Sequence, residues 1–121
     1  MRKTENPLAD KSYEFAIQIV RLYKKIIRIE KEYVLSKQLL KSGTSIGANI
    51  SEANGAISKA DFSAKVSIAY KESLETKYWL SLLRDSDYVE AEEANTLIDK
   101  ADELSKIMFS ILKTTRIKVQ P

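Results

Sequence analysis

The chain has 121 residues, with 20 Lys and Arg, 17 Asp and Glu, and neither His nor Cys. This length suits one domain with a real core, and the 44% hydrophobic content argues against disorder. Without Cys or His the chain lacks a thiol nucleophile, zinc–thiolate ligands and the usual general base near neutral pH, so we expect no enzyme activity, no cofactor and no metal site.

Residue choice favours helices along the whole chain. Gly and Pro are scarce, with three and two copies, whereas Ala, Leu, Lys, Glu, Ile and Ser dominate. No apolar run reaches the length that spans a bilayer, and the first residues lead into an amphipathic pattern rather than an apolar signal segment. We therefore expect a soluble, cytoplasmic, all-α protein that makes no contact with a membrane.

Four amphipathic segments follow one another with short connections between them. They are predicted as helices at about residues 8–29, 36–54, 59–84 and 88–116. Short connections make consecutive helices antiparallel neighbours. Residues 1–121 are therefore expected to form a single domain, an antiparallel up-down-up-down four-helix bundle.

The predicted helix ends carry residues that suit them. Asn6 followed by Pro7 suits the start of the first helix, and Gly55 suits the end of the second. Ser58, with an acidic residue three positions later, resembles a capping box at the start of the third helix. Asp87 is expected to cap the fourth helix, whose first turn is rich in glutamate.

The first helix carries more apolar surface than one bundle core needs. One stripe comprises Tyr13, Ala16, Ile17, Val20, Tyr23 and Ile27. A second stripe comprises Phe15, Ile19, Leu22, Ile26 and Ile29. Together they cover roughly 240° of the helix circumference, so we expect the second stripe, with Trp79 of the third helix, to contact another subunit of a homo-oligomer. The alternative is a deeply packed helix in a monomer.

The second helix contains two glycines one turn apart, Gly43 and Gly47. Each costs roughly 1 kcal/mol against Ala inside a helix, so their presence predicts a close approach of a neighbouring helix. Ser45 and Asn49 are expected to hydrogen-bond within that contact. A phosphate-binding loop is excluded, because the spacing differs from that of a P-loop and no Lys-Ser/Thr pair follows the second glycine.

Two motifs of this chain resemble those of a known family. The first is QLLKSGTSIGANISEA at residues 38–53. The second comprises Asp61-Phe62, Ile68-Ala69-Tyr70-Lys71-Glu72-Ser73, Glu75-Thr76 and Tyr78-Trp79-Leu80. Both are similar to motifs of the four-helix-bundle proteins encoded in intervening sequences of bacterial 23S rRNA genes, which are often labelled S23 ribosomal proteins. The accessory variability determinant of diversity-generating retroelements looks like a relative.

This resemblance implies a bundle that assembles into a ring, typically a homopentamer. It also implies a suspected role in nucleic-acid binding or as a scaffold, and it implies no established biochemical activity. The word "ribosomal" refers to where some of the genes lie and does not make the protein a component of the ribosome.

Basic residues cluster in the first helix and near the C-terminus, whereas segment 84–103 is mainly acidic. The candidate phosphate-binding residues are Arg21, Lys24, Lys25, Arg28, Lys113, Arg116 and Lys118. A phosphate backbone binds such clusters regardless of sequence, and a ring would multiply a modest patch. No aromatic residues are interleaved with these cations in a way that suggests base stacking, so we expect contacts to RNA or DNA phosphates with little base readout. The alternatives are an ordinary solvated helix face and an adaptor ring that binds a protein partner.

Glu72 and Glu75 lie on one face of the third helix, near Trp79. Paired carboxylates inside a bundle bind metals together with Glu-x-x-His motifs, which this chain cannot supply. We therefore expect the two glutamates to pair with Lys or Arg, or to hydrogen-bond with groups of the second helix such as Asn49.

Overall fold

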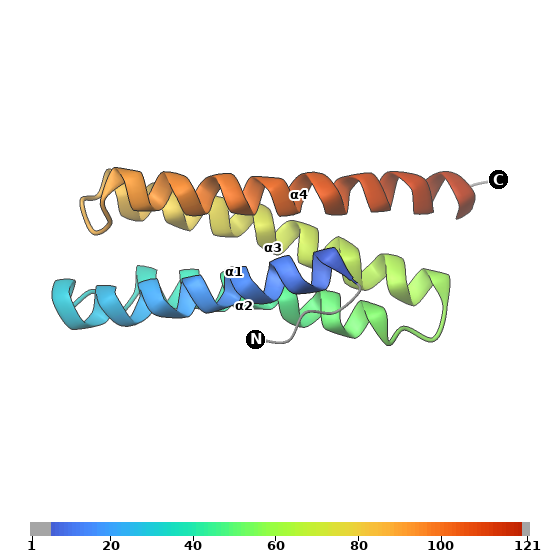
Figure 1. Cartoon of the computed structure of the whole chain (residues 1–121), viewed down its shortest axis with the longest axis horizontal. Helices are drawn as coiled ribbons and strands as arrows, with labels where there is room; N and C mark the ends of the chain where they lie inside the picture. Colours follow the sequence, from blue (N-terminus) through green and yellow to red (C-terminus); the bar gives the residue numbers. More distant parts are fainter. Residues whose placement is uncertain (1–5, 120–121) are drawn as a thin grey trace.

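A computed structural model describes residues 6–119 of the chain, with side chains described as far as Thr115. The helices are α1 (Pro7–Lys25), which continues into a π-helical turn η1 (Ile26–Glu30), then α2 (Leu35–Asn54), α3 (Lys59–Asp85) and α4 (Ala91–Val119). No strand occurs among residues 6–119. Consecutive helices run antiparallel and lie side by side (Figure 1), so the expected four-helix architecture is confirmed.

Three of the expected helix ends are confirmed by hydrogen bonds. The side chain of Asn6 accepts a hydrogen bond from the Ala9 amide at 3.1 Å, directly before Pro7 at the first helical position. Gly55 forms the C-cap of α2. The hydroxyl of Ser58 accepts a hydrogen bond from the Asp61 amide at 3.0 Å and so caps α3. Local side-chain chemistry at these ends therefore agrees with the tertiary fold.

Asp87 has a different role from the one expected. It adopts a left-handed conformation with φ 66°, and α4 begins only at Ala91. The amide of Tyr88 donates to the carbonyl of Leu83 at 2.9 Å, across the Asp87 turn. This is the bonding pattern of a helix C-terminus, so Asp87 ends α3 rather than starting α4, and the prediction was wrong.

The junction between α1 and α2 contains two features that the helical pattern does not predict. The last turn of α1 widens into the π-helical segment, and Lys31 then turns the chain with φ 56°. Glu32 is 9% exposed, and its carboxylate accepts hydrogen bonds from the first amides of α2. The carboxylate thereby satisfies amides that have no partner within the helix.

The core runs the length of the bundle between the four helices. It includes Ile19 and Leu22 of α1, Ile46 of α2, Leu80 of α3 and Met108 of α4, which are at most 2% exposed. Within residues 6–115 no buried side-chain nitrogen or oxygen lacks a hydrogen-bond partner. Two hydroxyl pairs join the helices inside this core, Ser42 with Thr76 and Ser73 with Ser105. Since buried hydroxyls need specific partners, these pairs fix the register of α3 against its neighbours.

The packing of α1 is uneven. It lies closely against α2, whereas an open groove separates much of it from α4. Two ion pairs join α1 to α4, Lys11 with Glu103 and Lys25 with Glu93, and the second of them lies in this groove. Within residues 6–119 no helix is both long and apolar enough to cross a membrane.

Candidate nucleic-acid interface

Three of the candidate cations form a strip along the outer face of α1. Arg21 and Lys24 lie on α1 three residues apart, and Arg28 follows four residues later on the same side, in the π-helical turn η1 that continues α1. All three are exposed, and none forms an ion pair with another described residue. The core residues Ile19 and Ile26 occupy the opposite side. We call Arg21, Lys24 and Arg28 the α1 strip.

Lys25 is separated from this strip, because it faces α4. Its ammonium nitrogen lies 2.8 Å from the Oε1 atom of Glu93. The hydrogen bond to Glu93, and then the negative charge of the same group, raise the pKa of Lys25. A cation that already has a carboxylate partner has less to gain from a phosphate. The structure therefore divides the basic cluster of the first helix into three free cations and one paired cation.

The groove beside Lys25 has a volume of about 580 Å³ and lies between α1 and the first turns of α4. Arg21 and Lys25 line one wall, while Glu90, Glu92 and Glu93 line the other. Carboxylates on the second wall repel a phosphate group, which carries the same sign of charge. The groove is therefore a poor anion site. Arg21 lines it but is exposed, and the α1 strip that Arg21 forms with Lys24 and Arg28 is the better site.

The cations near the C-terminus do not join the α1 strip. Lys113 is exposed on the last turns of α4, at the end of the bundle opposite to the α1–α2 junction (Figure 1). Arg116 and Lys118 lie outside the residues whose side chains are described. The structure thus brings together only the part of the predicted set that lies on α1.

The two glycines of α2 are confirmed as the site of a close helix contact. A Cβ atom at Gly43 would lie 2.8 Å from the Cγ1 and Cγ2 atoms of Ile19, and one at Gly47 would lie 3.2 Å from the carbonyl oxygen of Ser12. Both contacts are with α1, which explains how that helix approaches α2 so closely.

Ser45 and Asn49 do not take part in this contact. The hydroxyl of Ser45 donates to the carbonyl of Lys41 at 2.7 Å, and the side-chain amide of Asn49 donates to the carbonyl of Ser45 at 2.8 Å. Both bonds lie within α2, so the expected hydrogen bonds across the glycine contact are corrected. On a helical wheel these two residues point toward the α3 side, away from Gly47.

The two glutamates of α3 lie in different environments. Glu75 accepts a hydrogen bond from the indole nitrogen of Trp79 at 3.1 Å. Burial raises the pKa of Glu72, and the charge of Glu75 adds to this effect, whereas Lys41 of α2 opposes it. Neither glutamate hydrogen-bonds with Asn49. Among the described residues there is no group of three or more acidic side chains placed to hold a metal ion.

The expected oligomer interface is corrected at four of its five positions. Phe15, Ile19, Leu22 and Ile26 are at most 2% exposed inside the core of their own chain, so they cannot reach another subunit. Helical periodicity predicts two adjacent apolar stripes on α1. Packing against α2 and α4 buries the stripe that contains Phe15 and Ile19. Tyr13, from the stripe expected inside, is 57% exposed. Trp79 is partly buried at the edge of the core, and its contact with a second subunit stays a prediction.

A protein family and a solved structure are similar to this chain. A family model described as 23S rRNA-intervening sequence protein matches residues 4–110. A crystal structure of a protein with unknown function from the S23 ribosomal protein family of Bacteroides thetaiotaomicron VPI-5482 is similar, with 50% sequence identity and a TM-score of 0.86. The match covers 88% of this chain and 98% of that one. No curated protein sequence matches the chain.

Proposed function

Because the chain belongs to the 23S rRNA-intervening sequence protein family, whose function is unknown, we propose a function from the geometry of its own surface. We propose that it is a non-catalytic, oligomeric scaffold that binds RNA or DNA through the phosphate backbone. The observation that carries this proposal is the α1 strip, where Arg21, Lys24 and Arg28 are exposed and free of carboxylate partners.

Phosphate contacts need positive charge and access, and the α1 strip offers both. Three cations on one helical face span about 10 Å, at a rise of 1.5 Å per residue. A duplex carries one negative charge per about 1.7 Å of its axis, so several phosphates come within reach of such a strip. The released counterions make this kind of binding strong at low salt and weak at high salt.

We also infer that copies of the chain assemble into a homo-oligomer, a ring by likeness to the family. Exposed apolar side chains on more than one face support assembly, among them Tyr13 on α1 and Ile68 on α3. In an oligomer each α1 strip would be repeated, and several weak contacts would act on the same nucleic acid. Light scattering is expected to give a multiple of the 13.8 kDa chain mass. A mass of one chain at micromolar concentration would contradict this inference.

A pair of triple variants tests the α1 strip. In the first, Arg21, Lys24 and Arg28 are each replaced by Gln. In the second, which is the matched control, Lys11, Lys25 and Lys65 are replaced by Gln, since these lysines are paired with Glu103, Glu93 and Glu52. Both variants lose three positive charges.

Only the first triple variant is expected to lose affinity for a DNA duplex in fluorescence anisotropy. Equal losses in the two variants would mean that net charge, and not the α1 strip, attracts the nucleic acid. Binding by neither the variants nor the unaltered protein would favour the adaptor ring that binds a protein partner.

A further inference from the structure

The outer face shared by α3 and α4 carries aromatic side chains that the core does not use. Phe109 of α4 is 55% exposed, and its ring centroid lies 5.9 Å from that of Tyr70 on α3. Leu74 and Tyr78 continue the α3 side at four-residue spacing from Tyr70, and they are 41% and 60% exposed. The two helices thus present one continuous aromatic and apolar surface to solvent.

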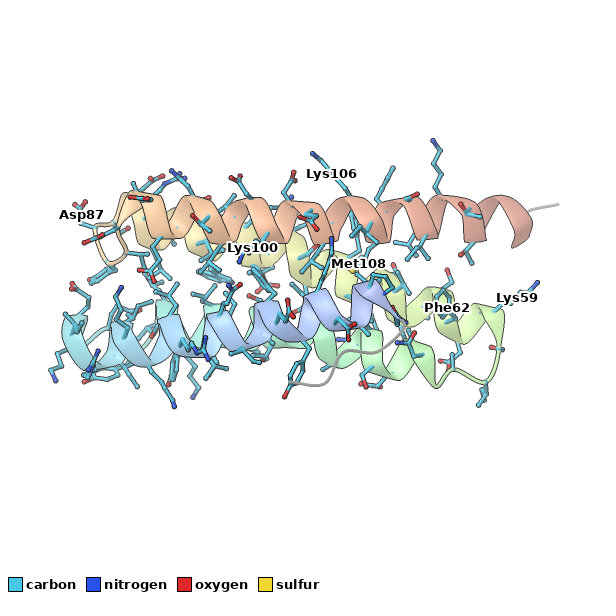
Figure 2. The ribbon with its side chains drawn as sticks, in the orientation of Figure 1. Lys59, Phe62, Asp87, Lys100, Lys106 and Met108 are labelled. Atoms are coloured by element: carbon cyan, nitrogen blue, oxygen red, sulfur yellow. The ribbon has the colours of Figure 1, made fainter. Side chains whose placement is uncertain are left out.

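Lysines alternate with these aromatic residues. Lys106 and Lys113 stand three residues before and four residues after Phe109, so they flank it on the same side of α4. Lys71 lies on the face of α3 that carries Leu74 and Tyr78. All three lysines are exposed, and Lys106 points away from the bundle (Figure 2). Lys71 and Lys113 form no ion pair with a described residue.

Lysines outnumber carboxylates on this surface, where Lys71, Lys77, Lys106 and Lys113 lie beside Asp102 and Glu75. Glu75 is exposed one turn after Lys71 and accepts a hydrogen bond from Trp79. Asp102 is the acidic residue beside Lys106, and it is already bound by Lys77 at 3.0 Å and by Lys106 at 3.1 Å. The bonds from Lys77 and Lys106 lower the pKa of Asp102, so it stays ionised and neutralised by its partners. Asp99, one turn earlier on α4, begins the acidic part of that helix and marks the end of the surface.

We propose that the α3–α4 surface binds single-stranded nucleic acid, with bases stacked on Phe109 and Tyr78 and phosphates held by Lys71 and Lys113, the two lysines without a carboxylate partner. Every base has a π face that stacks on an aromatic ring, and a duplex hides those faces inside its own stack. Lysines around the rings favour a polyanion over a second apolar surface. This inference goes beyond backbone contacts and does not depend on the α1 strip, because the two surfaces lie on different helices.

The test compares variants of the full-length chain in fluorescence anisotropy with a single-stranded RNA of 20 uridines and a DNA duplex of 20 base pairs. Phe109→Ala is expected to weaken binding of the single strand roughly tenfold and to leave duplex binding unchanged. Phe109→Leu keeps an apolar side chain without a π face, and it is expected to behave like Phe109→Ala. Tyr33→Ala is the matched control, since Tyr33 is a similarly exposed aromatic residue at the α1–α2 junction, and no loss is expected.

A second readout comes from the only tryptophan of the chain, Trp79. The rings of Tyr78 and Trp79 meet edge to face with centroids 5.0 Å apart. A base stacked on Tyr78 therefore changes the surroundings of the indole. The single strand is expected to quench the Trp79 fluorescence, whereas the duplex is expected to leave it unaltered.

Three results would overturn the stacking proposal. The first is single-strand affinity that does not change in Phe109→Ala. The second is an equal loss for single strand and duplex, which would indicate backbone contacts alone. The third is a smaller particle mass for Phe109→Ala, which would show that the surface is covered by a second copy of the chain. A failure of the proposal that the α1 strip binds phosphates would be recognised separately. In that case the variant with Arg21, Lys24 and Arg28 replaced by Gln would keep its affinity for the duplex.

Discussion

Glu32 and Ser36 are joined by two hydrogen bonds at the start of α2. The amide of Ser36 donates to the Oε1 atom of Glu32 at 2.7 Å, and the hydroxyl of Ser36 donates to the carbonyl of Glu32 at 2.7 Å. The second carboxylate oxygen accepts the amides of Val34 and Leu35 at 2.7 and 3.1 Å. One nearly buried glutamate thus satisfies three amides where the chain turns from α1 into α2.

Glu32→Ala is expected to lower the free energy of unfolding by about 1–2 kcal/mol, the usual cost of removing a helix cap. Chemical denaturation monitored by circular dichroism measures this change. Glu30→Ala is the matched control, because Glu30 is an exposed glutamate two residues away. An equal effect of the two substitutions would contradict the capping role.

The same carboxylate gives a pH dependence. Burial raises the pKa of Glu32, but the hydrogen bonds from the amides of Val34, Ser36 and Leu35 outweigh it and hold the pKa below its ordinary value of 4.5. A lowered pKa in the folded state means that the stabilisation is complete above the unfolded pKa and is lost as the pH falls through the folded one. The stability difference between the unaltered protein and Glu32→Gln is therefore expected to be constant near pH 7 and to shrink below about pH 4.5. A difference that grows in acid would disprove this assignment.

Gly43→Ala tests the close contact between α1 and α2. Alanine adds about 1 kcal/mol of helix propensity, but its Cβ atom would meet the γ carbons of Ile19 at 2.8 Å. Overpacking of this kind costs about 1–3 kcal/mol, so we expect a net loss of stability. Gly55→Ala should be nearly neutral, because its Cβ atom would meet only the Glu52 carbonyl at 3.7 Å.

A double-mutant cycle assigns the effect to one pair of residues. Ile19→Ala removes the atoms that clash, so Gly43→Ala is expected to be less harmful, or even stabilising, in that background. Thermal unfolding of the four proteins provides the four values of the cycle. Additive effects would show that Ile19 does not cause the clash.

Ile26→Glu distinguishes a core residue from an interface residue. Ile26 is 1% exposed, and a charge buried there without a partner is expected to cost more than about 4 kcal/mol. We expect loss of the helical signal in circular dichroism. A folded monomer, detected by circular dichroism together with light scattering, would instead place Ile26 at a subunit contact.

Much of the fold could be predicted from local sequence patterns. Helix caps such as Asn6 and Ser58 bind amides a few residues away, so neighbouring residues suffice to identify them. The close approach at Gly43 was also predictable, because a glycine inside a helix needs a reason to be there. The role of Asp87 could not be predicted in this way, because a short polar residue suits both the end of one helix and the start of the next.

Side-chain partners across the bundle were harder to predict. Two adjacent stripes on α1 are both apolar, and the positions of α2 and α4 decide that Phe15 lies inside and Tyr13 outside. The pairing of Lys25 with Glu93 likewise depends on how α1 and α4 face each other. Helical periodicity gives the direction of each side chain on its own helix, and tertiary packing decides what each side chain meets.

The central claim is that the α1 strip binds the phosphate backbone. The most direct test is the affinity of the unaltered protein for a 20-base-pair DNA duplex, measured by fluorescence anisotropy between 50 and 200 mM salt. Contacts from Arg21, Lys24 and Arg28 to three phosphates predict a slope of about −2.7 in log affinity against log salt, or a roughly 40-fold loss over this range. Replacement of all three by Gln is expected to flatten the slope. An absence of binding at 50 mM salt, or a slope that the substitutions leave unchanged, would contradict the account.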